Sequence, residues 1–119
     1  MATSGDETYI TITVGGTARS ALLDTGCSKS CIAQKFVPHV PLEPPDDQLY
    51  AANGTTINNL GAFTLKFKVG NIDVQARLQV SDQLDELIIG YDWLRENHCE
   101  WDFDARVLSV NGHKFHLSS

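Results

Sequence analysis

One short stretch of this sequence combines residue types that acid–base chemistry needs, namely Leu22-Leu23-Asp24-Thr25-Gly26. A carboxylate placed directly after an apolar run is costly to bury unless it is paired or hydrogen-bonded. Thr25 offers a hydroxyl for a supporting hydrogen bond, and Gly26 allows close approach of a ligand because it has no side chain. Asp-Thr-Gly alone is common in ordinary turns, so the rest of the chain must decide its role.

Thiols and imidazoles are the other candidates for chemistry. No pair among them has the spacing of a zinc finger on both sides, which argues against a metal site. An odd number of cysteines in a chain without a secretory signal indicates reduced thiols. We therefore expect no metal and no cofactor. The residues considered are Cys27, Cys31, Cys99, His98, His113 and His116.

Length and charge limit the possible functions. The 119 residues, 42% of them hydrophobic, fit one domain over 1–119. The net charge of −6 gives no electrostatic basis for binding nucleic acid or an anionic membrane. No apolar run has the length of a membrane span, and the first residues lack the pattern of a signal peptide. We expect a cytoplasmic protein, with an exported parent polyprotein as the open alternative.

Alternation of apolar and polar residues predicts β-strands along most of the chain. Tyr9–Val14 alternates, Gly15-Gly16 supplies a tight turn, and Thr17–Leu23 returns. Phe63–Val69 and Ile72–Val80 form the clearest strand pair. Short strands at regular spacing, with little helix, favour a small closed β-barrel.

The segments between and after these strands carry turn signals. Four prolines between Pro38 and Pro45 predict an extended surface connection. Asn53-Gly54 predicts a hairpin turn between strands within 48–52 and 55–60. Leu87–Ile89 is typical of a buried strand, and Asp92–Asn97 predicts the one helix, with Asp92 as its N-cap. A closing meander is expected over 101–103, 107–110 and 114–117, and the expected core includes Trp93, Leu94 and Trp101.

Three motifs in order give the sequence a family resemblance. Asp24-Thr25-Gly26 is followed by Ser28, Ser30 and Ile32, and later by Ile88-Ile89-Gly90-Tyr91-Asp92-Trp93-Leu94. Between them lie Ala51-Ala52-Asn53-Gly54-Thr55 and Gly61. This set resembles the retropepsins, the aspartic proteases of retroviruses and LTR retrotransposons, and is most similar to the Ty3/gypsy branch. The resemblance covers roughly Tyr9 to Leu117, the expected core of the domain.

The resemblance implies an all-β fold, a small closed barrel of the retropepsin type with one short C-terminal helix, active as a symmetric homodimer. It implies an aspartic endopeptidase that processes a Gag-Pol-type polyprotein, in the cytoplasm or within virus-like particles. One Asp-Thr-Gly in so short a chain means that a second copy must supply the other carboxylate.

The same resemblance implies roles for single residues. Asp24 from each subunit would form the catalytic pair, with Thr25 bonding across the twofold axis and Gly26 completing the motif. The segment around Asn53 would be a flap over a polypeptide substrate. The expected substrate-binding residues are Leu22, Cys27, Ser28, Ile32, Ala52, Asn53, Gly54, Thr55 and Ile88. Ile32 and Ile88 would otherwise be plain core residues.

The sequence departs from the family at three positions. Cys27 and Ser28 stand where many retroviral members have Ala-Asp, and Tyr91 replaces a common arginine. An ion pair between subunits that often uses these positions is therefore expected to be absent. Two other readings stay open: a domesticated cellular protease of the same type, and a dimerisation or binding module of the same fold with little activity.

Overall fold

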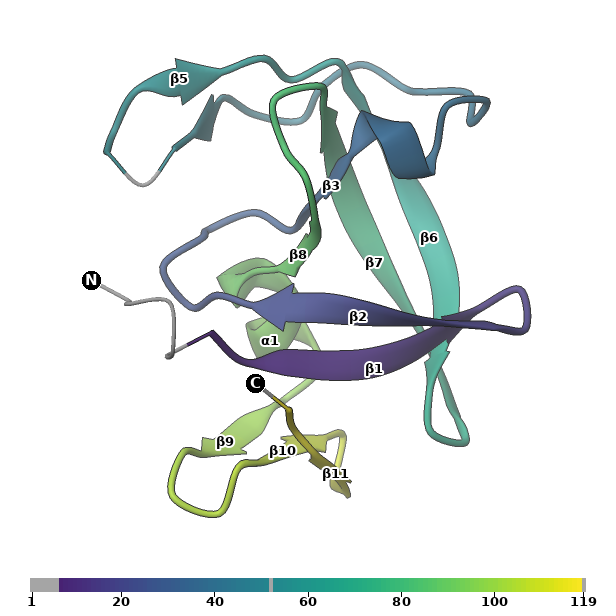
Figure 1. The fold of residues 1–119 in the computed structure, drawn as a ribbon, viewed down its shortest axis with the longest axis vertical. Helices are drawn as coiled ribbons and strands as arrows, with labels where there is room; N and C mark the ends of the chain where they lie inside the picture. The colour runs from purple at the N-terminus through teal and green to yellow at the C-terminus, as the bar shows by residue number, and fades with distance from the viewer. Residues whose placement is uncertain (1–6, 52, 119) are drawn as a thin grey trace.

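Six strands form a closed barrel in the order β1-β2-β8-β3-β7-β6 (Figure 1). The computed structural model describes residues 7–51 and 53–118. The barrel strands are β1 (Tyr9–Val14), β2 (Thr17–Leu23), β3 (Cys31–Ala33), β6 (Gly61–Val69), β7 (Ile72–Ser81) and β8 (Leu87–Ile89). The remaining elements are η1 (Gln34–Phe36), β4 (Leu49–Tyr50), β5 (Thr56–Ile57), α1 (Tyr91–Glu96), β9 (Glu100–Asp102), β10 (Val107–Val110) and β11 (His113–His116). The expected all-β class with a small closed barrel and one short helix is confirmed.

Two hairpins supply four of the barrel strands, as the alternating patterns predicted. β1 pairs with β2 from Tyr9 opposite Leu22 to Val14 opposite Thr17. Gly15 and Gly16 form the turn with φ of 56° and 85°, a region that suits glycine. β6 and β7 pair from Gly61 opposite Val80 to Val69 opposite Ile72, and β1 meets β6 at Thr13 and Lys68 to close the barrel.

The short strand β8 lies between β2 and β3, and this arrangement places the Asp-Thr-Gly segment. β8 runs parallel to β2, with Leu22 opposite Ile88, and antiparallel to β3, with Cys31 opposite Ile88. Leu87 and Ile89 of this strand are buried and Ile88 between them is half-buried, which accounts for its uninterrupted Leu-Ile-Ile sequence. The loop of residues 24–30, from the end of β2 to the start of β3, therefore begins and ends beside β8.

The helix begins one residue earlier than predicted, and Asp92 is not its N-cap. Gly90 is the N-cap residue, in an extended conformation with φ of −99° and ψ of −174°. Asp92 lies in the first turn, where its carboxylate accepts a hydrogen bond from the Trp93 amide at 2.8 Å. The prediction was wrong because Gly90 occupies a place too crowded for any side chain, and the chain turns there instead.

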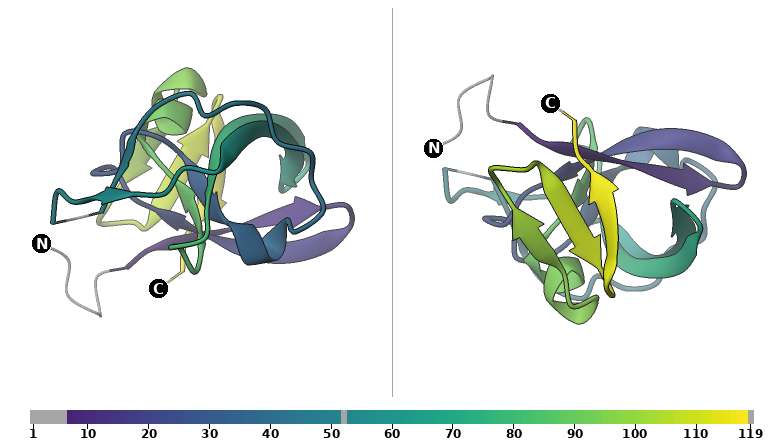
Figure 2. Two further views of the ribbon diagram at one scale, coloured as in Figure 1. Left: turned by 90° about the horizontal axis from the view of Figure 1, so that it is seen from above. Right: turned by 90° about the horizontal axis from the view of Figure 1, so that it is seen from below.

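The interior of the barrel is a single apolar cluster to which β1, β2, β6, β7, β8 and α1 all contribute. Trp93 and Leu94 are buried in it, and the half-buried Trp101 packs against it, as expected. The sheet β11-β10-β9 lies beside the barrel (Figure 2, right), where β1 bridges the last residues through Tyr9 and Ser118. No helix in the described part of the chain is long and apolar enough to cross a membrane.

Candidate active site

The backbone of Asp24 is fixed by the parallel pairing of β2 and β8. Its amide donates to the carbonyl of Ile89 at 3.0 Å, and its carbonyl accepts from the amide of Cys27 at 3.1 Å. The side chain is exposed, and one carboxylate oxygen accepts the Gly26 amide at 2.9 Å. A Cβ at Gly26 would lie 3.3 Å from that oxygen. The loop thus presents a carboxylate that is oriented by its own backbone and open to solvent.

Helix α1 holds the far end of this loop. The Ser30 hydroxyl is buried; it donates to Asp92 Oδ1 at 2.7 Å and accepts from the Gly90 amide at 2.9 Å. The Ser30 amide donates to both carboxylate oxygens of Asp92, at 3.0 and 3.1 Å. Asp92 therefore anchors the loop, because its carboxylate accepts hydrogen bonds from both the loop and the helix.

Gly90 lets the loop and the helix meet. A Cβ at this position would lie 2.4 Å from the carbonyl oxygen of Cys27 and 3.1 Å from the carbonyl carbon of Lys29. No real side chain tolerates such distances to backbone atoms. The adjacent Tyr91 amide donates to the same Cys27 carbonyl at 2.8 Å. The backbone of Gly90 therefore lies so close to the loop backbone at Cys27 and Lys29 that only glycine fits at this position of the Ile88-Ile89-Gly90 motif.

The Asp24 carboxylate borders a groove of about 570 Å³ that lies between this loop and the hairpin β4–β5. In Figure 1 the hairpin lies above the loop that joins β2 to β3. Asp24 is the only carboxylate among the described residues that line the groove. The other lining residues are Gly26, Cys27, Ser28, Lys29, Cys31, Gln48, Leu49, Tyr50, Ala51, Ile57, Gln83, Leu84 and Ile88.

The structure separates the predicted site residues by location. Four of the predicted substrate-binding and motif residues line the groove beside Asp24; these are Gly26, Cys27, Ser28 and Ile88. Leu22 is half-buried outside it, and Ile32 is 3% exposed within the barrel core, so neither contributes to its wall. Thr25 borders a different pocket, next to α1. Asn53, Gly54 and Thr55 form the exposed tip of the hairpin, and Ala52 lies outside the described residues.

The hairpin itself is short. In the described part of the hairpin two residue pairs join β4 to β5, Leu49 with Ile57 and Tyr50 with Thr56. At the tip the Asn53 side chain accepts the Thr55 amide at 3.1 Å and its hydroxyl at 2.7 Å. Sequence reasoning missed Leu49 and Ile57 as groove residues. The Asn53-Gly54 turn predicted the hairpin but not this register, because a two-residue turn there would place Tyr50, not Leu49, opposite Ile57.

The stem of the hairpin is bonded to β7 through amide side chains. The buried Gln79 accepts from the Asp46 amide at 3.0 Å and from Asn59 Nδ2 at 2.9 Å, and donates to the Asp46 carboxylate at 2.8 Å. Arg77 donates to the same carboxylate at 2.7 and 3.0 Å. The hydrogen bonds from Arg77 and then from Gln79 lower the pKa of Asp46 to about 2. The proline-containing connection and the hairpin are thus held to one strand.

Two thiols of the groove influence each other. The Cys27 thiol donates to the Lys29 carbonyl oxygen at 3.0 Å. Hydrogen bonding with Cys31 is the main cause that lowers the pKa of Cys27, and it raises the pKa of Cys31, which burial raises further. Cys99, elsewhere in the structure, has its pKa raised to about 11 by burial alone. Of the three thiols, Cys27 is therefore the one most inclined to ionise.

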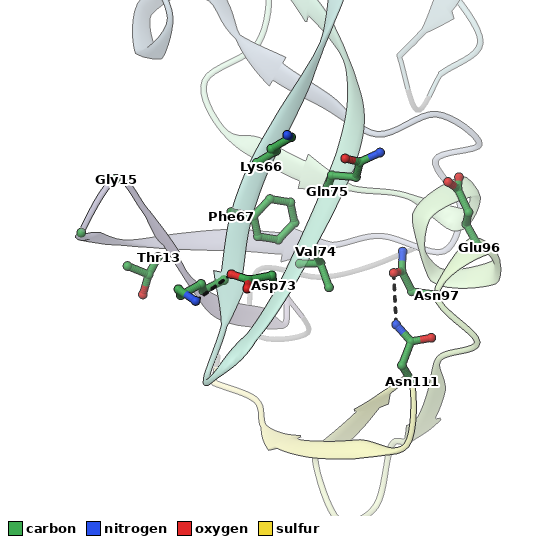
Figure 3. A pocket seen from close by; sticks show the side chains of 12 residues that line it. Thr13, Gly15, Lys66, Phe67, Asp73, Val74, Gln75, Glu96, Asn97 and Asn111 are labelled. Carbon is green, nitrogen blue, oxygen red and sulfur yellow. Dashed lines mark hydrogen bonds and ion pairs between the residues drawn. The ribbon is translucent and has the colours of Figure 1, made fainter.

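A larger pocket, of about 720 Å³, lies at the other end of the barrel (Figure 3). Its side chains include the ion pair of Lys68 with Asp73 at 2.7 Å and the hydrogen bond of Asn111 with Asn97 at 3.4 Å. Among the described residues that line it there is no cysteine, histidine or serine, and no carboxylate is placed there as Asp24 is placed in the groove, directly after a strand and within a glycine-containing motif. Within residues 7–51 and 53–118, no group of three or more potential ligands is arranged to hold a metal ion.

The family described as "gag-polyprotein putative aspartyl protease" matches residues 10–96, which is most of the chain. The chain therefore belongs to this family of retroviral-type aspartyl proteases. Among solved structures it is similar to the retroviral protease-like domain of Ddi1 from Leishmania major, with a TM-score of 0.75 and 17% identity. That match covers 95% of this chain and 94% of the other, so the two share the whole retropepsin-like fold.

Proposed function

We propose that this protein is an aspartic endopeptidase that acts as a homodimer, with Asp24 of each subunit completing one catalytic pair. The observation that carries the proposal is the exposed Asp24 carboxylate, the only one bordering the groove in the described residues. A peptidase of this class needs two carboxyls that share one water. One chain supplies one of them, so a twofold axis must bring the second.

The mechanism follows from two carboxyls at short distance. They do not both ionise readily, so the pair holds one proton, as it does in aspartic proteases generally. The ionised Asp24 takes a proton from the shared water while the protonated Asp24 of the second copy polarises the carbonyl of the peptide bond. The Gly26 amide, at 2.9 Å from the Asp24 carboxylate, orients that group for the transfer.

The groove favours an extended polypeptide as the substrate. Its apolar side chains come from the hairpin, through Leu49 and Ile57, and from β8, through Ile88. An extended chain that enters between loop and hairpin would place alternate side chains against these surfaces. We include Cys27 and Ser28, on the loop itself, among the substrate contacts.

A second pocket indicates where the two subunits of the proposed dimer would meet. Thr25, the neighbour of Asp24, borders an apolar pocket of about 430 Å³ with Tyr91, Leu94, Trp101 and Phe103. Tyr91 is 51% and Phe103 69% exposed in the single chain. An axis that joins two copies of Asp24 passes close to Thr25, so the second copy would cover this aromatic surface. This placement supports a dimer contact formed by α1 and β9 rather than by the missing ion pair.

The role in polyprotein processing and the Ty3/gypsy origin stay predictions. A retroviral protease-like domain also forms part of Ddi1 from Leishmania major. Likeness of fold therefore does not separate a protease of a mobile element from a cellular one. The coding sequence around this domain tests the point: a reverse transcriptase encoded downstream in the same frame is expected for the element, and its absence would favour the cellular protease.

The catalytic proposal is tested with Asp24→Asn, in which a nearly isosteric amide replaces the acid–base group. We expect peptide-library cleavage to fall by roughly 10²–10⁴-fold or more, the usual contribution of a general acid–base group. Asp73→Asn, at the other end of the barrel, is the matched control and should cleave like the wild type. Circular dichroism and sedimentation should show the fold and dimer of the wild type in both variants.

Two outcomes would contradict the proposal. Cleavage by pure Asp24→Asn at the wild-type rate would exclude Asp24 as the catalytic group. A folded, dimeric wild type that cuts no peptide in the library and binds no statine-type transition-state analogue would favour the binding module instead.

A further inference from the structure

The groove that holds Asp24 also holds two cysteines, Cys27 and Cys31. Cys27 lies in the loop after the Asp-Thr-Gly motif and is half-buried. Cys31 is the first residue of β3 and is only 3% exposed. The two thiols come from opposite ends of the same loop, so a bond between them would change the loop that carries Asp24.

The two thiols have complementary properties. Cys27 is the more accessible, and the interaction between the two thiols lowers the pKa of Cys27 and raises the pKa of Cys31. A thiolate is the form of cysteine that attacks peroxides. The resulting sulfenic acid condenses with a neighbouring thiol, which gives up its proton as it attacks, to form a disulfide. Cys99 lacks such a neighbour among the causes that shift its pKa, which are limited to burial.

We propose that Cys27 and Cys31 form a peroxide-sensitive dithiol that closes to a disulfide within the Asp24 groove. We further infer that closure of the disulfide stops peptide cleavage, and this second part rests on the proposed peptidase function. The reaction reverses with a dithiol reductant, because the disulfide joins the two ends of one loop and lies in an open groove that the reductant can enter.

Oxidation proceeds in two balanced steps. The Cys27 thiolate attacks one oxygen of hydrogen peroxide, the O–O bond breaks, and the departing hydroxide takes up a proton to leave as water. Cys27 is then a sulfenic acid. The Cys31 sulfur attacks the Cys27 sulfur and loses its proton, and the hydroxyl of the sulfenic acid leaves as the second water. Two thiols and one peroxide thus yield one disulfide and two waters.

The disulfide would act on Asp24 through the loop. Cys27 gives up its bond to the Lys29 carbonyl, at 3.0 Å, when its sulfur moves toward Cys31. The same residue donates its amide to the Asp24 carbonyl at 3.1 Å and accepts the Tyr91 amide at 2.8 Å. A shift of Cys27 therefore displaces the backbone of Asp24, and two copies of Asp24 would no longer share one water.

The first test detects the disulfide between Cys27 and Cys31 directly. The reduced full-length chain is treated with limiting hydrogen peroxide, alkylated, digested with trypsin and analysed by mass spectrometry. Trypsin cleaves after Lys29, so the disulfide should appear as a link between the peptides of residues 20–29 and 30–35. Cys99 should remain alkylated. Oxidation of Cys99 before Cys27, or no linked peptide at any dose that oxidises Cys27, would overturn the proposal.

Two variants make the test specific. In Cys31→Ser no linked peptide can form, and dimedone should trap a sulfenic acid at Cys27. Cys99→Ser, the matched control, should give the linked peptide at the wild-type dose. A Cys27 in Cys31→Ser that reacts with peroxide no faster than Cys99 would contradict its assignment as the peroxide-reactive thiol.

The second test measures how oxidation changes the rate of peptide cleavage. Turnover by the wild type should fall in proportion to the fraction of linked peptide and return with dithiothreitol. If the linked peptide forms and turnover is unchanged, the inhibitory role is wrong. If the linked peptide forms in a protein that cuts nothing even when reduced, the dithiol is upheld and the peptidase proposal fails, so the two failures are distinguishable.

Discussion

Ser30 shows how a residue outside the catalytic motif can determine the geometry of the site. Its hydroxyl is fully buried, and it joins the loop of Asp24 to Asp92 of α1 and to the amide of Gly90, the residue between β8 and α1. The pattern in the sequence identified Ser30 as part of a family motif, but not as a link. Its partners lie 60 and 62 residues away, beyond the reach of any local pattern.

We expect Ser30→Ala to destabilise the protein by about 1–3 kcal/mol, because the Gly90 amide loses its buried acceptor. Ser28→Ala, at an exposed position two residues away, is the matched control and should stay within about 0.5 kcal/mol of the wild type. Urea unfolding at neutral pH measures both variants. Equal stabilities would show that the Ser30 hydroxyl is not a structural link.

A second single residue, Asp46, gives a prediction for how the stability of the fold depends on pH. Its pKa is lowered from 3.8 to about 2 in the folded chain, chiefly by hydrogen bonds from Arg77. A depressed pKa means that the ionised group stabilises the fold above about pH 4, and that this contribution is lost as the pH falls through about 2. Asp46→Asn should therefore lower the free energy of unfolding at pH 6, with a difference that shrinks toward pH 2.

The control for this prediction is Asp85→Asn, which removes an ion pair with Lys35 whose side chains are 92% and 59% exposed. Exposed pairs of this kind contribute little, so this variant should unfold like the wild type at pH 6. A difference between Asp46→Asn and the wild type that is as large near pH 2 as at pH 6 would contradict the electrostatic origin.

At the scale of elements, the hairpin β4–β5 is held to the barrel by its stem and by the buried Leu49 at the base of β4. The two residue pairs of the hairpin contrast with the amide hydrogen bonds that fix its stem to β7. Few buried contacts and an exposed tip favour local opening at low cost in free energy. We therefore predict that the hairpin is a flap that opens for a substrate and closes over it.

Hydrogen exchange tests the flap. Amides at residues 53–55 should exchange quickly in the free protein and at least about tenfold more slowly with a bound peptide inhibitor. The amide of Leu78, in the middle of β7 and fully buried, is the internal control and should exchange slowly in both states. Tip amides that are equally protected with and without inhibitor would exclude a flap.

The elements also show what the sequence could predict. Period-two alternation identified β1, β6 and β7, and the turn at Gly15-Gly16 identified β2 as the returning strand. An uninterrupted apolar run identified β8, because buried strand positions must be filled by apolar residues. The start of α1 was misplaced by one residue. The crowding at Gly90 arises from the Cys27 carbonyl, a tertiary contact that has no local signal.

The composition of the groove shows the same limit. Asp24, Gly26 and Ile88 were found because they belong to motifs, whereas Gln83 and Leu84 belong to a turn without any pattern. Ile32 belongs to a motif and yet lies in the barrel core. Membership of a motif therefore predicted proximity to the site better than it predicted which face of a strand a residue occupies.

For the whole molecule, the prediction concerns the second copy. Phe103 stacks on Trp101 at 4.6 Å between ring centroids and is 69% exposed. Phe103→Asp would place a charge against the partner on both sides of a twofold axis. We expect the dimer to dissociate at least about tenfold more readily, a change of about 1.4 kcal/mol. Sedimentation across a dilution series, together with cleavage at each concentration, measures the effect.

Phe36→Asp is the matched control, since Phe36 is also an exposed phenylalanine but belongs to η1, away from Thr25. Its dimer should match that of the wild type. A Phe103→Asp dimer as tight as the wild type would exclude this surface as the contact between subunits while leaving the assignment of Asp24 intact.

The insertion of β8 between β2 and β3 has a consequence for the order of events during synthesis. Leu22 and Leu23 find their parallel partners only when Ile88 and Ile89 have been made, and the helix that anchors the loop follows still later. Contacts of such high sequence separation slow folding, because a long loop must close before they form. A nascent chain that ends before β8 can form the two hairpins but cannot order the Asp24 loop. Within a longer precursor, the same topology would keep the domain inactive until its last third has left the ribosome.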